Sequence, residues 1–134
     1  MIDIDCLLCV EDDSSNRLVM KLLVEKTLNP KNYAIFEDSA DFLPRVRNLP
    51  VRRDIILLDI HVSPFNGFQM LQMIREDSIY FDTKVVALTA SVMNEEVEKL
   101  RKSGFDGAIG KPITLFTFPI VIERIIKGES IWQV

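Results

Sequence analysis

The sequence has little of what membrane-spanning, secreted and nucleic-acid-binding proteins need. No apolar run approaches the roughly 18 residues of a membrane span. The net charge is −4, so the basic excess that binds a phosphate backbone is missing. Residues 1–5 are acidic where a secretory signal peptide is basic. We therefore expect a cytoplasmic protein with no membrane and no nucleic-acid partner.

Cysteine is also scarce, and the only two, Cys6 and Cys9, have the C-x-x-C spacing of redox and zinc sites. They lie in the unbroken apolar run 6–10, which is typical of a buried strand. Side chains three positions apart on a strand point to opposite faces, and no Cys or His pair elsewhere completes a zinc site. We interpret both as small buried apolar residues, which fits a reducing compartment.

What is present is the composition of one soluble globule. Hydrophobic residues make up 48% and charged residues 27% of 134 residues. We predict a single domain over 1–134, with a core over about 6–127 and a short tail over 128–134. Short apolar runs without polar alternation predict strands that are covered on both faces, hence a mostly parallel sheet. The expected strands are 6–10, 33–36, 55–58, 85–88 and 108–110.

Segments with helical spacing separate these runs. The expected starts are Ser14 or Ser15, Ser39 or Asp41, Gly67, Asn94 and Thr117. The first helix should stop before Asn29-Pro30, and the fourth should close at Gly104. The expected inward residues are Leu18, Leu22 and Leu23; Phe42, Leu43, Val46 and Leu49; Phe68, Leu71 and Ile74; and Ile122, Ile125 and Ile126. The alternation predicts a doubly wound α/β fold with helices on both faces of the sheet.

Polar residues follow the predicted strands. They are Glu11, Asp12 and Asp13, then Asp59, Thr89 and Lys111. Because the carboxyl ends of parallel strands share one edge of the sheet, these side chains should meet in one pocket. Clustered carboxylates favour a hard cation such as Mg²⁺. A carboxylate there can attack phosphorus, while lysine and Mg²⁺ neutralise the transferring oxygens.

These motifs resemble, in order and spacing, the receiver domains of two-component response regulators, from Leu8 to about Ile126. The likeness rests on 10–13, on 54–59 with its terminal aspartate, on Gly67 eight residues beyond Asp59, on 85–90, on 103–106 and on 111–112. The resemblance implies a flavodoxin-like sheet of five parallel strands in the order 2-1-3-4-5, with five helices.

By position, the resemblance also implies roles. Asp59 would accept a phosphoryl group, Lys111 would pair with it, and Thr89 would swing toward it. Asp12 and Asp59 would bind Mg²⁺ together with the backbone carbonyl of His61, and Glu11 would act mostly through water. The family's Lys-Pro bond is commonly cis, so Lys111-Pro112 is expected to be cis.

Two positions depart from the family pattern. Ala108 stands three residues before Lys111, where the family often has an aromatic switch residue. The resemblance therefore implies no rotating ring at that position to couple phosphorylation to the surface. In the loop after Asp59 the usual proline position holds Ser63, and Pro64 follows one residue later, so the loop geometry is expected to differ.

Two further residues allow two readings each. The sole histidine, His61, is interpreted as an exposed loop residue; alternatively its side chain tunes water access to the acyl phosphate. The sole tryptophan, Trp132, is expected to pack on the last helix; alternatively it belongs to an exposed docking tail.

The function implied is that of a single-domain response regulator. A histidine kinase or histidine phosphotransfer protein would donate the phosphoryl group to Asp59 in a Mg²⁺-dependent reaction, and the chain would catalyse only its own phosphorylation and dephosphorylation. Only about eight residues follow the fifth helix, so the output is expected to be contact with a downstream protein or, on phosphorylation, with a second copy. Otherwise the chain is expected to serve as a phosphate relay or sink. The alternative is a pseudo-receiver that acts as an interaction module without phosphorylation. A phosphohydrolase is disfavoured because His61 stands where its second aspartate would, and a dinucleotide enzyme because no G-x-G-x-x-G follows the first strand.

Overall fold

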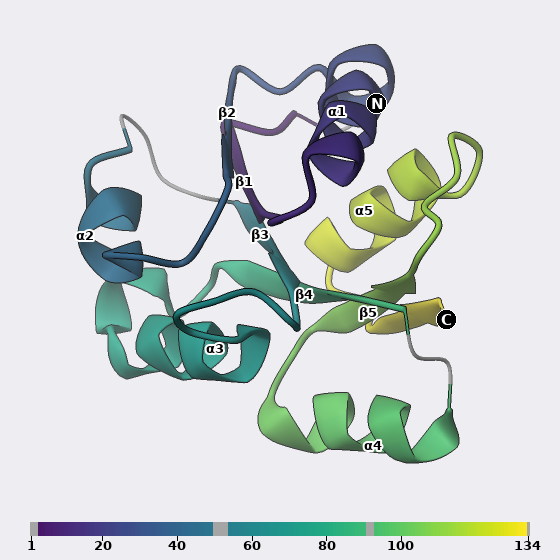
Figure 1. Cartoon of the computed structure of the whole chain (residues 1–134). Helices are drawn as coiled ribbons and strands as arrows, with labels where there is room; N and C mark the ends of the chain where they lie inside the picture. Colours follow the sequence, from purple (N-terminus) through teal and green to yellow (C-terminus); the bar gives the residue numbers. More distant parts are fainter. Residues whose placement is uncertain (1–2, 50–53, 91–92, 134) are drawn as a thin grey trace.

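The computed structural model describes residues 3–49, 54–90 and 93–133, and within them one parallel sheet lies between two layers of helices (Figure 1). The strands are β1 (Cys6–Val10), β2 (Asn32–Phe36), β3 (Ile55–Asp59), β4 (Lys84–Thr89), β5 (Gly107–Gly110) and β6 (Ile131–Gln133). Their order is β2-β1-β3-β4-β5-β6, and every pair is parallel. The doubly wound parallel fold is confirmed.

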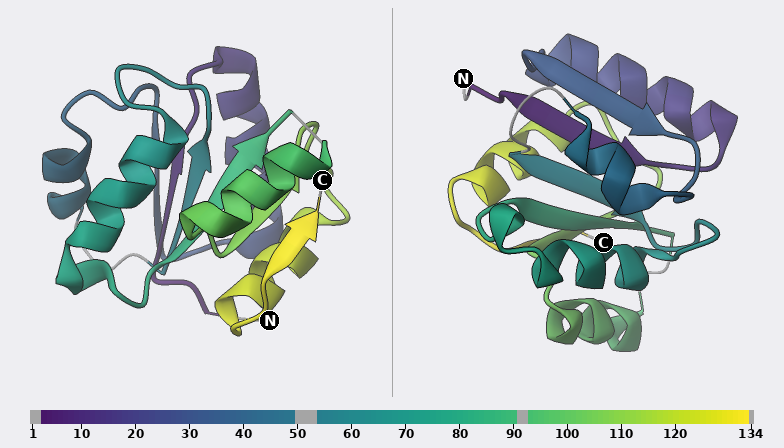
Figure 2. Two further views of the ribbon diagram at one scale, coloured as in Figure 1. Left: turned by 90° about the horizontal axis from the view of Figure 1, so that it is seen from below. Right: turned by 90° about the vertical axis from the view of Figure 1, so that its left-hand side faces the viewer.

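The connections between strands are helical, as predicted. The helices are α1 (Ser14–Leu23), its π-helical continuation η1 (Val24–Leu28), α2 (Phe42–Arg47), α3 (Gly67–Glu76), the 3₁₀ turn η2 (Ser78–Tyr80), α4 (Asn94–Ser103) and α5 (Phe118–Ile126). One face of the sheet carries α1 and α5, and the other carries α2, α3 and α4 (Figures 1 and 2). No helix among the described residues is long and apolar enough to cross a membrane.

The central strands are buried along their whole length, which explains their lack of polar alternation. Successive side chains of a strand enter opposite layers, so Leu7 and Leu57 pack with α1 and α5, whereas Leu8 and Ile56 pack with α2, α3 and α4. Cys6 and Cys9 are buried and form no disulfide, as expected.

The sheet has a sixth strand where the sequence suggested only a tail. Residues 131–133 pair in parallel with β5, so that Ile131 lies beside Gly107 and Trp132 beside Ala108. A Cβ on Gly107 would stand 2.6 Å from the Ile131 carbonyl oxygen, so the missing side chain is what lets β6 approach. A three-residue run is too short to show a strand period, which is why the five-strand prediction was wrong.

Trp132 lies on the other side of the sheet from the one expected. It packs against the cluster of the α2, α3 and α4 layer, and the Arg101 guanidinium of α4 lies 5.0 Å from its ring centroid. Ile131 is the residue that packs with the α1 and α5 layer. Register decides this: once β6 is a strand, adjacent side chains must enter opposite layers.

The inward stripe predicted for α1 is partly wrong. Met20 and Leu23 are buried, whereas Leu18 and Leu22 are 60% and 50% exposed. Continuation of the helix into η1 brings Val24 and Leu28 into the core, and this sets the buried face around Met20 and Leu23. The spacing of Leu18 and Leu22 is equally helical, so periodicity alone did not choose between the two stripes.

Helix termini follow the prediction with one change of cap. The carboxylate of Asp13, rather than a serine, caps α1 by accepting from the backbone N–H of Ser15. Asp41 is the N-cap of α2, which leaves Pro44 in the first turn where no helical N–H partner is lost. Gly104 ends α4 with a φ of 103°, as its position after the helix predicted.

Candidate phosphoacceptor site

The register of the sheet brings the predicted site residues to one edge. Asp59 ends β3 opposite Leu88 of β4, and Thr89 ends β4 opposite Gly110 of β5. The backbone N–H of Lys111 donates to the Thr89 carbonyl at 2.8 Å, which fixes the start of the chain beyond β5. Residues far apart in sequence thus share one pocket because parallel strands end together.

Lys111 ties the site together through its ammonium group. Its Nζ lies 2.6 Å from Glu11 Oε1 and 2.8 Å from Asp59 Oδ2. The two carboxylates are only 3% and 8% exposed, so these charge-assisted bonds are poorly screened by water. Opposite Lys111, the backbone N–H of His61 donates to Asp59 Oδ1 at 2.9 Å. Both oxygens of Asp59 are therefore held, and the carboxylate has one orientation.

The two buried carboxylates differ in their affinity for a proton. Burial, with the neighbouring Asp59, raises the pKa of Glu11. Burial also acts to raise the pKa of Asp59, but hydrogen bonds from Glu11, Lys111 and the His61 N–H outweigh it, so its pKa is lowered. For Lys111, burial opposes the charge, yet the two carboxylates raise its pKa above the ordinary value. The lowered pKa favours the ionised form of Asp59 over that of Glu11.

The carboxylates form a group suited to a hard divalent cation. Ligand oxygens of Glu11, Asp12 and Asp59 all lie within 4.8 Å of one another. Three carboxylates meet one ammonium group here, so a cation would relieve their repulsion. Asp12 is exposed and the other two are buried, an open geometry of the kind in which Mg²⁺ keeps several waters. The donor set fits Mg²⁺.

Arg17, which the sequence reasoning did not single out, supports this acidic segment. Its Nη1 donates to the backbone carbonyls of Glu11 at 3.1 Å and Asp12 at 2.8 Å. The backbone N–H of Asp13 also donates to Glu11 Oε2 at 3.2 Å. Hydrogen bonds from a side chain of α1 thus fix the turn after β1. The only sequence signal for this contact is the position of an arginine one helical turn beyond the acidic residues.

The family model for the response regulator receiver domain matches residues 7–121. The chain belongs to the response regulator receiver family. It is 32% identical over 110 residues to the sensor histidine kinase AruS of Pseudomonas aeruginosa, which is 81% of this chain but 11% of that kinase. It is 32% identical over 74 residues to the polar-differentiation response regulator DivK of Brucella anthropi, 55% of this chain and 58% of that protein.

Solved receivers share the fold at low sequence identity. The chemotaxis response regulator CheY4 of Vibrio cholerae has a TM-score of 0.80 and 21% identity, with 91% of this chain and 98% of that one covered. The receiver domain of the sensor histidine kinase PA1611 of Pseudomonas aeruginosa has a TM-score of 0.79 and 20% identity, with coverage of 95% and 100%, and that structure holds a magnesium ion in its active-site cleft. Because the chain spans only 5% to 11% of the kinases it matches, the likeness to them concerns one domain.

The receiver's β3–α3 loop is held by a residue that sequence reasoning placed only as a helix cap. Ser39 is buried, and its hydroxyl both accepts from the Phe65 N–H and donates to the Phe65 carbonyl, each at 2.7 Å. Its own N–H donates to the Ser63 carbonyl at 3.2 Å.

The expected cis bond at Lys111-Pro112 is confirmed, and Ser63-Pro64 is a second cis bond, at the displaced proline. His61 is exposed, as expected.

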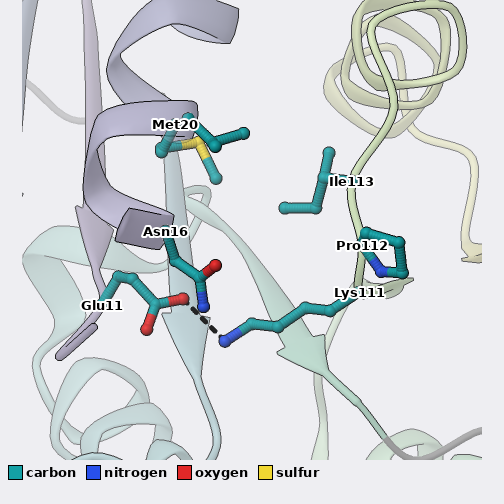
Figure 3. Close-up of a pocket in the computed structure, with 7 residues that line it drawn as sticks. Glu11, Asn16, Met20, Lys111, Pro112 and Ile113 are labelled. Carbon is teal, nitrogen blue, oxygen red and sulfur yellow. Dashed lines mark hydrogen bonds and ion pairs between the residues drawn. The ribbon is translucent and has the colours of Figure 1, made fainter. Parts of the chain in front are cut away.

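A cavity of about 90 Å³ opens beside the Glu11–Lys111 pair, between α1 and the segment after β5 (Figure 3). Asn16 and Met20 of α1 line one side, and Pro112 and Ile113 line the other. It leads from the charged site to the outer surface of α1, where Val19 forms part of its wall. The receiver site is therefore continuous with a partly apolar surface.

Proposed function

We propose that this receiver accepts a phosphoryl group on Asp59 from a phosphohistidine of a histidine kinase or histidine phosphotransfer protein. The observation that carries the proposal is the placement of Lys111, whose ammonium touches both the acceptor carboxylate and Glu11 at one buried edge of the sheet. The complete set of acids, hydroxyl and lysine favours phosphorylation over the role of an unphosphorylated interaction module.

The proposed transfer is a substitution at phosphorus. A carboxylate oxygen of Asp59 forms the new P–O bond, the P–N bond to the donor imidazole breaks, and the electron pair stays with that imidazole. Lys111 stabilises the charge on the equatorial phosphoryl oxygens, and the His61 N–H keeps the acceptor carboxylate in place. The receiver catalyses only this step and the later hydrolysis of the acyl phosphate, in which water attacks phosphorus and inorganic phosphate leaves, regenerating the Asp59 carboxylate.

Glu11, Asp12 and Asp59 are the side chains that would hold Mg²⁺, together with the His61 carbonyl that the resemblance assigns. When bound, the ion supplies charge neutralisation for the phosphoryl group. Thr89 is buried at the end of β4, the strand next to Asp59, and its hydroxyl can donate to a phosphoryl oxygen there. Such a contact would report the modification to the segment that leads into α4.

Exposed apolar side chains near the site supply a surface for the donor. They are Leu18, Val19 and Leu22 on α1 and Leu115, Phe116 and Ile120 around the start of α5. α1 and α5 cover the same face of the sheet, and the cavity of Figure 3 joins this surface to Lys111. A protein that brings a phosphohistidine to Asp59 would bury these side chains, which otherwise face water.

Intact mass after incubation with Mg²⁺ and acetyl phosphate tests the proposal. We expect the gain of one phosphoryl group by the wild-type chain, no gain by Asp59→Asn, and a normal gain by Asp41→Asn. Asp41 is a matched control because it is exposed and its side chain caps nothing. Removal of Mg²⁺ with a chelator should abolish the gain. If neither acetyl phosphate nor a phosphorylated histidine phosphotransfer protein modifies Asp59, the proposal is wrong.

A further inference from the structure

The helix α4 is held to the rest of the molecule by few contacts. Of its ten residues only Leu100 is buried. Two cation–π contacts also join it to other elements: Lys99 Nζ lies 4.7 Å from the ring centroid of Phe68 on α3, and the Arg101 guanidinium lies 5.0 Å from that of Trp132 on β6. Each cation–π contact at a partly exposed site is weak, so α4 can move at small cost in free energy.

β6 is built to hold Trp132 in a defined place. Gly128, with a φ of 110°, turns the chain after α5, and the Arg124 guanidinium binds Glu129 through two bonds of 3.0 Å. Gly107 leaves room for the strand to approach β5, and the register sets Trp132 beside Ala108 in the same cluster. Figure 2 shows β6 at the edge of the sheet on the side of α4. The residue that contacts Arg101 therefore belongs to a strand whose position is fixed by these contacts.

The topology connects this contact to Asp59. α4 follows β4, the strand that ends in Thr89, while β6 is attached to β5, on the far side of β4 from Asp59. If Thr89 moves toward a group on Asp59, the start of α4 is drawn toward β3 and away from β6. A packed helix moves as a unit, so Arg101 would withdraw from Trp132.

We propose that β6 is a latch on α4: Trp132 holds α4 packed while Asp59 is unmodified, and the Trp132–Arg101 contact loosens when Asp59 carries a phosphoryl group. The switching half of this inference rests on the proposed function; the holding half does not. By linkage, a latch that favours the unmodified conformation must make phosphorylation of Asp59 less favourable in free energy, and its removal must make it more favourable.

The holding half is tested on the unmodified full-length chain by amide hydrogen exchange. Trp132→Ala and Arg101→Gln should each speed exchange in α4 about two- to fivefold, with α3 unchanged. Arg101→Gln removes the contact without changing a residue of β6, so it tests the role of the contact even if Trp132→Ala loosens the strand itself. Phe81→Ala, which removes a ring that is 81% exposed and lies outside α4 and β6, is the matched control and should change nothing.

The switching half is read from Trp132, because it is the only tryptophan in the chain. On phosphorylation its emission should move to longer wavelength as the ring becomes more hydrated, and Asp59→Asn should show no change. Trp132→Ala and Arg101→Gln should take up phosphoryl groups from acetyl phosphate about two- to fivefold faster than the wild type, and Trp132→Phe should lie between.

The outcomes separate the two proposals. If mass shows a phosphoryl group on Asp59 but the emission and the rates of the variants are unchanged, the latch is wrong and the proposed function stands. If no phosphoryl group enters the wild-type chain, the proposed function fails and the switching half with it. Equal exchange of α4 in the wild type, Trp132→Ala and Arg101→Gln overturns the holding half in either case.

Discussion

The helices α3 and α4 have ten residues each and cover the same face of the sheet, yet they are attached to it very differently. α3 buries Gly67, Met70, Leu71 and Ile74 and begins with a reciprocal capping box between Asn66 and Gln69. α4 buries one residue, and the side chain at its N-cap position, Met93, makes no capping hydrogen bond. α3 follows the strand that ends in Asp59, and α4 follows the strand that ends in Thr89.

This difference in packing separates a rigid side of the site, next to Asp59, from a weakly packed side, next to Thr89. The Asp59 carboxylate, which both Lys111 and the His61 N–H hold, lies on the firmly packed side, where Gly67 sits so close that a Cβ would stand 2.9 Å from Ile60 Cα. The element that should respond to modification lies on the weakly packed side. A two-state response requires that the moving element be held by only a few kcal/mol, and α4, with one buried residue against four in α3, is the less firmly anchored of these two helices.

The largest effect should come from truncating one buried apolar side chain on each helix. Ile74→Ala should lower the free energy of unfolding by about 4 kcal/mol, because the rigid packing around α3 leaves a cavity. Leu100→Ala should cost only about 2 kcal/mol, because α4 can move in to fill the space. Urea denaturation of both variants measures this. Equal losses would contradict the contrast between the two helices.

A smaller effect should come from exchanging the caps. Asn66→Ala removes the cap of α3 and should cost about 1 kcal/mol. Met93 has the extended backbone of an N-cap residue, so Met93→Ser should add a cap to α4 and stabilise it by about 0.5 kcal/mol. Thermal unfolding of both variants measures these changes in stability. Met93→Ala is the control, because alanine has no side-chain hydrogen-bond acceptor to cap the helix. A lower unfolding temperature for Met93→Ser than for the wild type would contradict this prediction, because it would show that a capping residue at this position does not stabilise α4.

The smallest effect should come from the tether at the end of α3. Arg47 Nη2 lies 2.9 Å from Asp77 Oδ2, and this bond lowers the pKa of Asp77, with help from the Ile79 N–H. A lowered pKa stabilises the fold above the ordinary aspartate value of about 4, and the contribution is lost as the pH falls through the lowered value. Urea unfolding between neutral and acidic pH should therefore show a slope that Asp77→Asn reduces. An unchanged slope would show that the tether contributes nothing.

The site could be predicted because its chemistry stands at strand ends. A buried parallel strand is recognisable from its apolar run, and the residue that follows it, such as Asp59 or Lys111, must then lie at the common edge. The supporting contacts could not be predicted in this way. The His61 N–H and the Ser39 hydroxyl act through loop geometry, and loop geometry follows from the packing of segments distant in sequence.

The edge strand β6 could not be predicted from the sequence, for a different reason. Ile131, Trp132 and Gln133 have no period of their own, and they become a strand only because β5 offers them an open edge and Gly107 offers them space. The inner face of α1 was misassigned for a related reason, since Leu18–Leu22 and Met20–Leu23–Val24 are both plausible stripes and contact with the sheet decides between them.

By itself the sequence determined the α/β class, the central strands, most helix limits, the family and the polar residues that meet at one edge of the sheet. These follow from local properties: apolar runs, caps, breakers and the position of polar residues after strands. The tertiary structure alone decided the sixth strand, the layer that Trp132 enters, the double contact of Lys111 and the weak attachment of α4. Those depend on which distant segments come together, and free energy of packing, rather than local propensity, settles that.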